Sequence, residues 1–87
     1  MPYRMAQAMP NWFVFLRLEA SLAMTFIRTA KLTPSAEGAA RNRGNARKAL
    51  TQIQKGLDKP AYYGLSEDEV VFLELCSAEI EVALAKF

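Results

Sequence analysis

Four basic residues of the chain lie close enough together to bind phosphate groups. Arg41, Arg43, Arg47 and Lys48 fall within eight residues, and such a cluster can make several salt-dependent contacts to a nucleic-acid backbone. A dedicated nucleic-acid-binding domain is usually strongly basic overall, whereas this chain has a net charge of only +2. Nucleic-acid binding through this segment is therefore our alternative prediction and not the favoured one.

The carboxylates near the C-terminus are spaced for a surface stripe and not for a metal site. Glu67, Asp68 and Glu69 are consecutive, so on a helix their side chains point in different directions. Carboxylate metal sites in helical bundles normally add histidine from a Glu-x-x-His motif, and this chain contains no histidine. The sequence therefore predicts no metal site and no cofactor.

Two isolated groups remain as candidates for catalysis. Glu19 lies inside an apolar stretch, where an acid catalyst with a raised pKa is one interpretation. No second carboxylate is nearby in sequence, so we favour an ion pair with Arg43 or Arg47. Cys76 is the only cysteine, which excludes an internal disulfide, and we expect a small apolar core residue there. Because histidine-dependent triads are also excluded, we predict a non-enzymatic protein without catalytic residues.

Charge is sorted along the chain. Residues 35–59 carry six basic against two acidic side chains, whereas residues 60–87 carry one basic against six acidic. Two series recur every seven residues, which is about two helical turns: the basic Arg41, Lys48 and Lys55, and the acidic Glu67, Glu74 and Glu81. We expect the basic stripe to face solvent or a second chain, and the acidic stripe to border an interface.

Two helices are predicted in the first part of the chain. Asn11 is a good N-cap for a helix over about 12–32, and Thr33–Pro34 ends it because the residue before proline avoids helical geometry. A second helix is predicted over about 35–57, since its apolar residues keep helical spacing. Gly38 and Gly44 weaken this second helix by roughly 1 kcal/mol each relative to alanine.

A third helix, over about 67–86, has the clearest local signal. Ser66 and Glu69 have the spacing of a capping box, and Leu65 and Val70 that of a hydrophobic staple. Three helices joined by short loops predict an all-α, antiparallel three-helix bundle. We assign residues 1–87 to this single helical domain, with residues 1–11 as an N-terminal arm or short helical turn.

The run Asn45–Leu50, with the sequence NARKAL, is similar to segments of helical repeats. Together with the helical hairpin over about 12–57, it resembles a tetratricopeptide hairpin, and the whole arrangement is similar to the three-helix microtubule-interacting-and-transport domain. The Trp, Gly, Tyr and Pro spacings that define tetratricopeptide repeats are absent. The resemblance therefore concerns architecture and implies no family membership.

Apolar residues exceed what a small three-helix core needs. The chain is 52% hydrophobic, the first helix is apolar over most of its circumference, and the third carries two apolar seams on opposite sides. Either the N-terminal arm covers the second seam, or the chain forms a homodimer or binds a helical protein. We favour an interaction or oligomerisation module with an interface at Trp12, Phe13, Phe15, Val71, Leu75 and Val82.

One apolar run deserves comparison with targeting signals. The run Trp12–Leu16 is cut by Arg17 and Glu19, so it is shorter than the roughly 7–15 residues of a signal-peptide core. It is also far below the roughly 20 residues that span a bilayer. We therefore expect no membrane partner and a cytoplasmic location.

Overall fold

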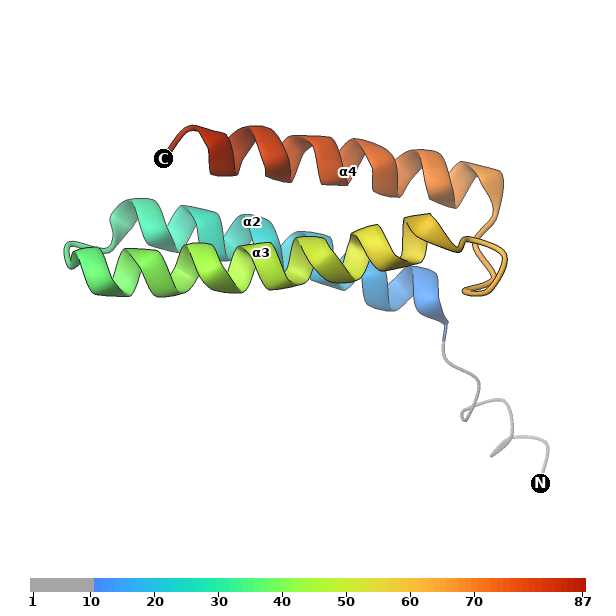
Figure 1. Ribbon diagram of the computed structural model, residues 1–87, viewed down its shortest axis with the longest axis horizontal. Coiled ribbons are helices and arrows are strands. Elements are labelled where there is room, and N and C mark those ends of the chain that lie inside the picture. The colour runs from blue at the N-terminus through green and yellow to red at the C-terminus, as the bar shows by residue number, and fades with distance from the viewer. Residues whose placement is uncertain (1–10) are drawn as a thin grey trace, which may run out of the picture.

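The computed structural model describes residues 11–87, so the expected N-terminal arm lies outside the described residues except for Asn11. It contains α2 (Trp12–Leu32), α3 (Ala36–Asp58) and α4 (Glu67–Ala85). These helices run antiparallel in sequence order and pack against one another (Figure 1). The predicted all-α three-helix bundle is confirmed, and each predicted helix boundary agrees within one residue.

The ends of α2 follow from local chemistry. The Oδ1 atom of Asn11 accepts a hydrogen bond from the Val14 amide at 3.2 Å, which satisfies one of the free N–H groups of the first turn. At the other end, Thr33 adopts an extended conformation, as expected for a residue that precedes proline. Ser35 then caps α3 directly, because its hydroxyl accepts the Gly38 amide at 2.8 Å.

A short loop connects α3 to α4 and ends in the predicted capping box. Gly64 has a φ of 67°, a left-handed conformation that glycine adopts without strain. The Ser66 hydroxyl accepts the Glu69 amide at 3.2 Å, and the Glu69 carboxylate accepts the Ser66 amide at 2.9 Å. This reciprocal pair fixes the first residue of α4.

Small residues dominate the contact between α2 and α3. Five alanines of these two helices are buried, at Ala20, Ala23, Ala30, Ala46 and Ala49, together with Ile27 and Ile53. Gly56 is also buried, and a Cβ atom there would meet Cδ1 of Leu16. Because helix separation depends on the side chains at the contact, these residues let α2 and α3 pack closely as a hairpin.

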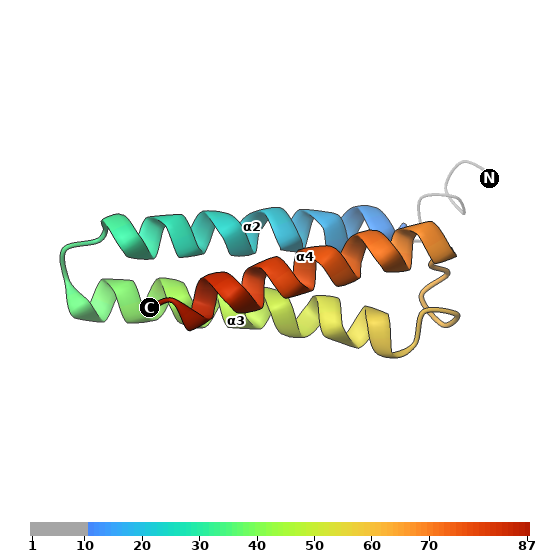
Figure 2. The same ribbon diagram turned by 90° about the horizontal axis from the view of Figure 1, so that it is seen from above.

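Helix α4 lies across this hairpin and contacts both of its helices. Viewed from above, its first turns lie near α2 and its last turns near α3 (Figure 2). Contacts at the two ends agree with this crossing: Phe13 packs on Phe72 with ring centroids 5.7 Å apart, and the Arg43 guanidinium lies 4.9 Å from the Phe87 ring centroid. The inner face of α4 buries only Leu73, Ser77 and Ile80.

Candidate interaction surfaces

The outer side of α4 carries a row of exposed apolar side chains. Val71, Leu75 and Val82 are 55%, 64% and 55% exposed, although each is large and hydrophobic. Ala78 completes the row and is also exposed. We call these four residues the outer row. Their spacing of four, three and four residues places them on one side of the helix, opposite the buried Leu73 and Ile80.

A second apolar surface lies on the hairpin, on the side that α4 does not cover. There, α2 and α3 enclose a groove of about 620 Å³, lined by Trp12, Phe15, Glu19, Leu22, Phe26, Asn45, Lys48, Ala49 and Gln52. We call it the hairpin groove. Its α2 wall is mostly aromatic and aliphatic, whereas α3 contributes mainly polar residues. Phe15 and Leu22 are 39% and 38% exposed, so this wall is open to solvent.

The six residues predicted as a partner interface therefore fall in three places. Val71, Leu75 and Val82 form the outer row, and Trp12 and Phe15 line the hairpin groove. Phe13 lies elsewhere: it is half-buried between α2 and α4, against Phe72 and under the Arg17 guanidinium. The groove itself was not predicted, although Phe15 and Leu22 lie seven residues apart in the sequence and therefore on one side of α2.

The four basic residues proposed for phosphate contacts lie on two sides of α3. Lys48 lines the hairpin groove, and Arg41, one heptad earlier, lies on the same side of the helix. Arg43 is half-buried under α4, where its guanidinium stacks on Phe87, and Arg47 lies one turn away on that side. Arg41, Arg47 and Lys48 are exposed, but the four do not form one continuous patch.

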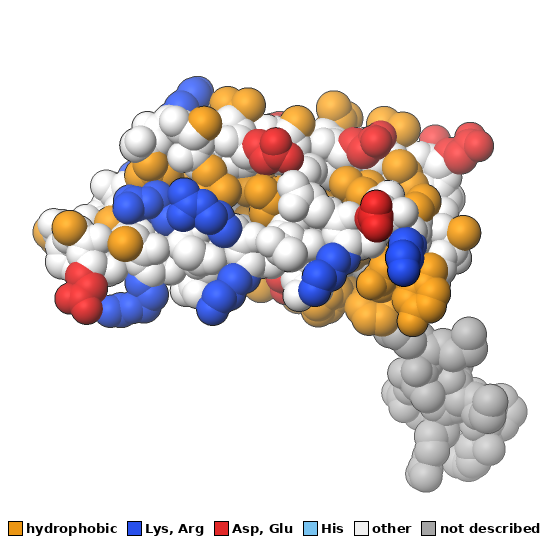
Figure 3. Space-filling view, in the orientation of Figure 1, with side chains coloured by type: hydrophobic (Ala, Val, Ile, Leu, Met, Phe, Trp, Pro, Cys, Tyr) orange, Lys and Arg blue, Asp and Glu red, His pale blue; other side chains and the backbone are white. Residues whose placement is uncertain are grey.

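The two charged stripes follow two different helices. Glu67, Glu74 and Glu81 are all exposed along α4, as are Arg41, Lys48 and Lys55 along α3. In the face shown in Figure 3, acidic side chains follow α4 and basic side chains follow α3. Glu81 meets α3 through Gln54, whose amide donates to its carboxylate at 3.3 Å, and not through an ion pair.

An ion pair between Glu19 and Arg43 or Arg47 was expected from the sequence, but Glu19 does not pair with an arginine of α3. It is half-buried and lines the hairpin groove, together with Lys48 and Gln52. Arg43 faces α4 instead and stacks on Phe87. The expected ion pair is wrong because Arg43 and Arg47 lie on the side of α3 that faces away from Glu19.

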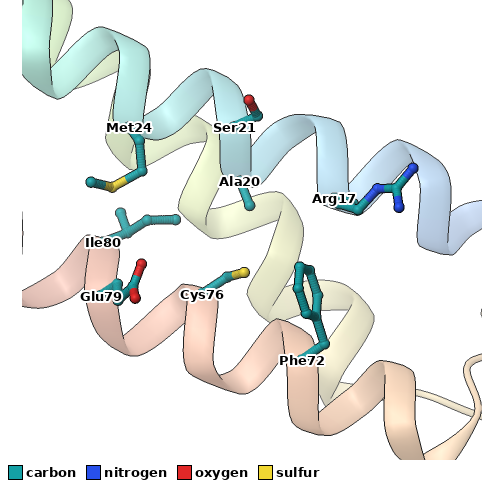
Figure 4. A pocket seen from close by; sticks show the side chains of 8 residues that line it. All are labelled: Arg17, Ala20, Ser21, Met24, Phe72, Cys76, Glu79 and Ile80. Carbon is teal, nitrogen blue, oxygen red and sulfur yellow. The ribbon is translucent and has the colours of Figure 1, made fainter.

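A smaller groove between α2 and α4 contains the single cysteine. It holds about 220 Å³ and is lined by Arg17, Ala20, Ser21, Met24, Phe72, Cys76, Glu79 and Ile80 (Figure 4). Cys76 is half-buried there. Burial raises the pKa of its thiol, and the Glu79 carboxylate raises that pKa further. A raised pKa disfavours the nucleophilic thiolate, which agrees with the predicted role of Cys76 as a small core residue.

The tyrosine pair of the α3–α4 loop is divided between two environments. The Tyr63 ring packs edge-on against Trp12, with centroids 5.1 Å apart, and so covers one end of the hairpin. Tyr62 packs on Tyr63 but is itself 77% exposed. The loop therefore extends the apolar surface at the end of the hairpin groove that contains Trp12.

Two further findings apply to the described part of the chain. No group of three or more cysteine, aspartate or glutamate residues is placed to hold a metal ion within residues 11–87. None of the three helices α2, α3 and α4 is long and apolar enough to cross a bilayer.

Comparisons with known proteins found no match for this chain. Neither models of protein families, nor curated proteins, nor solved structures match the chain. What the geometry offers is two open apolar surfaces, the outer row and the hairpin groove, on opposite sides of one bundle. Each is bordered by a charged stripe, acidic beside the outer row and basic beside the groove.

Proposed function

We propose that the chain is a small, non-enzymatic helical interaction module, which associates with a second copy or another helical protein. Association removes the outer row of α4 and the open wall of α2 from water. The observation that carries this proposal is the exposure of Val71, Leu75 and Val82 in a continuous row. Contiguous exposed apolar surface of this kind is typical of interaction sites.

The size of the apolar surface argues for contact through more than one helix. Full burial of one valine or leucine side chain contributes about 1.5–3 kcal/mol. Val71, Leu75 and Val82 are already nearly half buried, so together they contribute about 3–5 kcal/mol, which is at the low end of the roughly 4–15 kcal/mol that association costs in translational and rotational freedom. A stable complex needs the hairpin groove or a comparable surface in addition to the outer row.

Two weaker inferences accompany the proposal. Nucleic-acid binding by α3 remains the alternative, and the exposed Arg41, Lys48 and Lys55 are the observation in its favour. We rank it second because the Arg43 guanidinium stacks on the Phe87 ring and is less available to a phosphate. A cytoplasmic location is proposed on the single cysteine, since a reducing compartment suits a thiol without a disulfide partner.

Sedimentation velocity over micromolar to millimolar protein tests the proposal. We expect the weight-average mass to rise above the 9.7 kDa of the monomer, and Leu75→Ser to shift this rise to at least tenfold higher concentration. Leu32→Ser is the matched control, because Leu32 is also an exposed leucine, 78% accessible, but lies outside both surfaces. A wild-type chain that stays at monomer mass throughout contradicts self-association.

A further inference from the structure

We propose that the occupant of the hairpin groove is helix α4 of a second copy, so that the chain assembles head to tail. This inference rests on the proposed function and specifies the partner and its orientation. The outer row of one molecule would lie against Phe15, Leu22 and Phe26 of the next. Two surfaces that are otherwise unrelated would then be buried in a single contact.

Matching charge is the first argument for this pairing. On its α3 side the outer row is flanked by Glu67, Glu74 and Glu81, whereas on its α2 side it borders Lys31, Glu79 and Lys86. The hairpin groove is flanked on its α3 side by Arg41, Lys48 and Lys55. Both series step by seven residues, about 10.5 Å along a helix, so a single alignment of the two helices can pair several opposite charges. Complementary charge of this kind sets orientation and partner choice.

The arrangement within one molecule supplies the direction of the pairing. Helix α4 lies across the hairpin and antiparallel to α3. Its Glu81 contacts Gln54 of α3, and Glu67 and Glu74, at seven-residue spacing, lie on the same side of α4. A second copy stacked on the open side in the same orientation would bring its glutamates to the lysines of α3. The expected register places Lys48 opposite Glu81 and Lys55 opposite Glu74 of the second copy. It also brings the outer row level with the α2 wall of the groove.

Two symmetric alternatives bring like charges together. Two outer rows packed face to face and antiparallel would place the Glu67, Glu74 and Glu81 stripe beside its own copy, and like charges at flanking positions oppose pairing. Two grooves packed about the centre of the α2 wall would bring Glu19 against its own copy, because Glu19 is midway between Trp12 and Phe26. The head-to-tail contact avoids both.

A head-to-tail contact has a consequence that a two-fold dimer lacks. Each molecule keeps one free α4 and one free groove, so association continues into a chain of molecules unless the rotation closes a ring. Mutating either surface blocks growth at one side only. Two molecules that are blocked on different sides still share one intact contact.

Mixing two variants tests this consequence. Leu75→Lys disrupts the outer row and Leu22→Glu disrupts the groove, and both positions are at least partly exposed, so each monomer is expected to keep its helical circular-dichroism spectrum. Sedimentation should show each variant alone at 9.7 kDa and the equimolar mixture as a dimer of twice that mass. Lys48→Glu combined with Lys55→Glu is a second groove variant that changes only exposed side chains. Arg28→Glu, which adds negative charge on the polar side of α2, is the matched control and should assemble like the wild type.

The outcomes separate this inference from the proposed function. A wild type that assembles, while each variant alone still forms dimers, would contradict head-to-tail contact and leave the proposed function standing with a symmetric interface. Variants that remain monomeric when mixed would contradict it as well, because an intact α4 and an intact groove are both present. A wild type that never assembles contradicts this inference together with self-association.

Discussion

In the α2–α3 hairpin, alanine and glycine lie beside a few buried large residues such as Ile27 and Ile53, whereas α4 presents large apolar residues on both sides. Ala46 and Ala49 of α3 are buried against α2, and Gly56 makes room for Leu16. Helix α4 buries Leu73 and Ile80 but leaves Val71, Leu75 and Val82 more than half exposed. The difference teaches that the hairpin helices pack closely through small residues, while α4 is divided between the core and an exposed apolar row.

The most damaging change is expected inside the hairpin. Ile53 and Ile80 are both fully buried, so alanine at each position compares the two regions with the same chemistry. We expect Ile53→Ala to cost about 4 kcal/mol and Ile80→Ala about 2 kcal/mol, within the usual range of about 2–5 kcal/mol. The site of Ile80 borders an open groove, so its neighbours can relax into the space. Chemical denaturation measures both, and equal losses would show that α4 packs as tightly as the hairpin.

Gly56 tests the close approach of the two hairpin helices. A Cβ atom there meets Leu16, and overpacking of a buried site costs about 1–3 kcal/mol, which outweighs the helix propensity gained from alanine, about 1 kcal/mol. We expect Gly56→Ala to lower the free energy of unfolding by about 1 kcal/mol. Gly44→Ala is the control, because nothing lies within 4 Å of its added Cβ, and it should be stabilising. A stabilising Gly56→Ala would contradict the proposed close contact.

The helix caps were the features best predicted from sequence. Asn11 and Ser66, the two N-caps expected from the sequence, accept the predicted hydrogen bonds, because capping depends on residues only three positions apart. Ser35 was expected to be the first residue of its helix and is instead its N-cap. The two-sided α4 was predicted for the same reason, since its seams follow from local spacing. Local chemistry therefore determined the three helices and the faces that they present.

What the sequence did not predict depends on the contacts between helices. Ser77 is buried in the inner face of α4, where its hydroxyl donates a hydrogen bond to the Glu81 carboxylate at 3.3 Å. Serine is usually exposed to solvent, so its burial was not expected. The hairpin groove and the position of Glu19 within it follow from the rotation of α2 against α3. That rotation is set by buried alanines, whose sequence pattern is too weak to fix it in advance.

The capping box tests the independence of α4 from the hairpin. Ser66→Ala removes the hydrogen bond to the Glu69 amide, and such changes cost about 1 kcal/mol. Hydrogen exchange should become faster in the first turn of α4 and stay unchanged in the middle of α2 and α3. Ser35→Ala, at the matching position of α3, should instead affect the hairpin. Uniformly faster exchange after Ser66→Ala would show that the bundle opens as one unit.

The smallest expected effect concerns the thiol at the α2–α4 contact. Burial raises the pKa of Cys76 in the folded state, so the folded chain holds the thiol proton more tightly than the unfolded chain. Stability is therefore constant at neutral pH and falls as the pH rises from the unfolded value, about 8.5, towards the raised folded value. Urea unfolding should show that the free energy of unfolding falls between neutral and alkaline pH, and that this fall is smaller in Cys76→Ala. Identical pH dependence in the two proteins would contradict burial of the thiol.

Methyl chemical shifts recorded over a range of protein concentrations test the central claim most directly, because they report on individual surfaces. The methyl groups of Val71, Leu75 and Val82 should shift together with those of Leu22 as concentration increases, while those of the buried Leu73 and Ile53 stay in place. Shifts confined to the two open surfaces would support a divided α4 that packs inwards and associates outwards. Unchanged spectra up to millimolar concentration, or equal shifts in the core, would contradict this account.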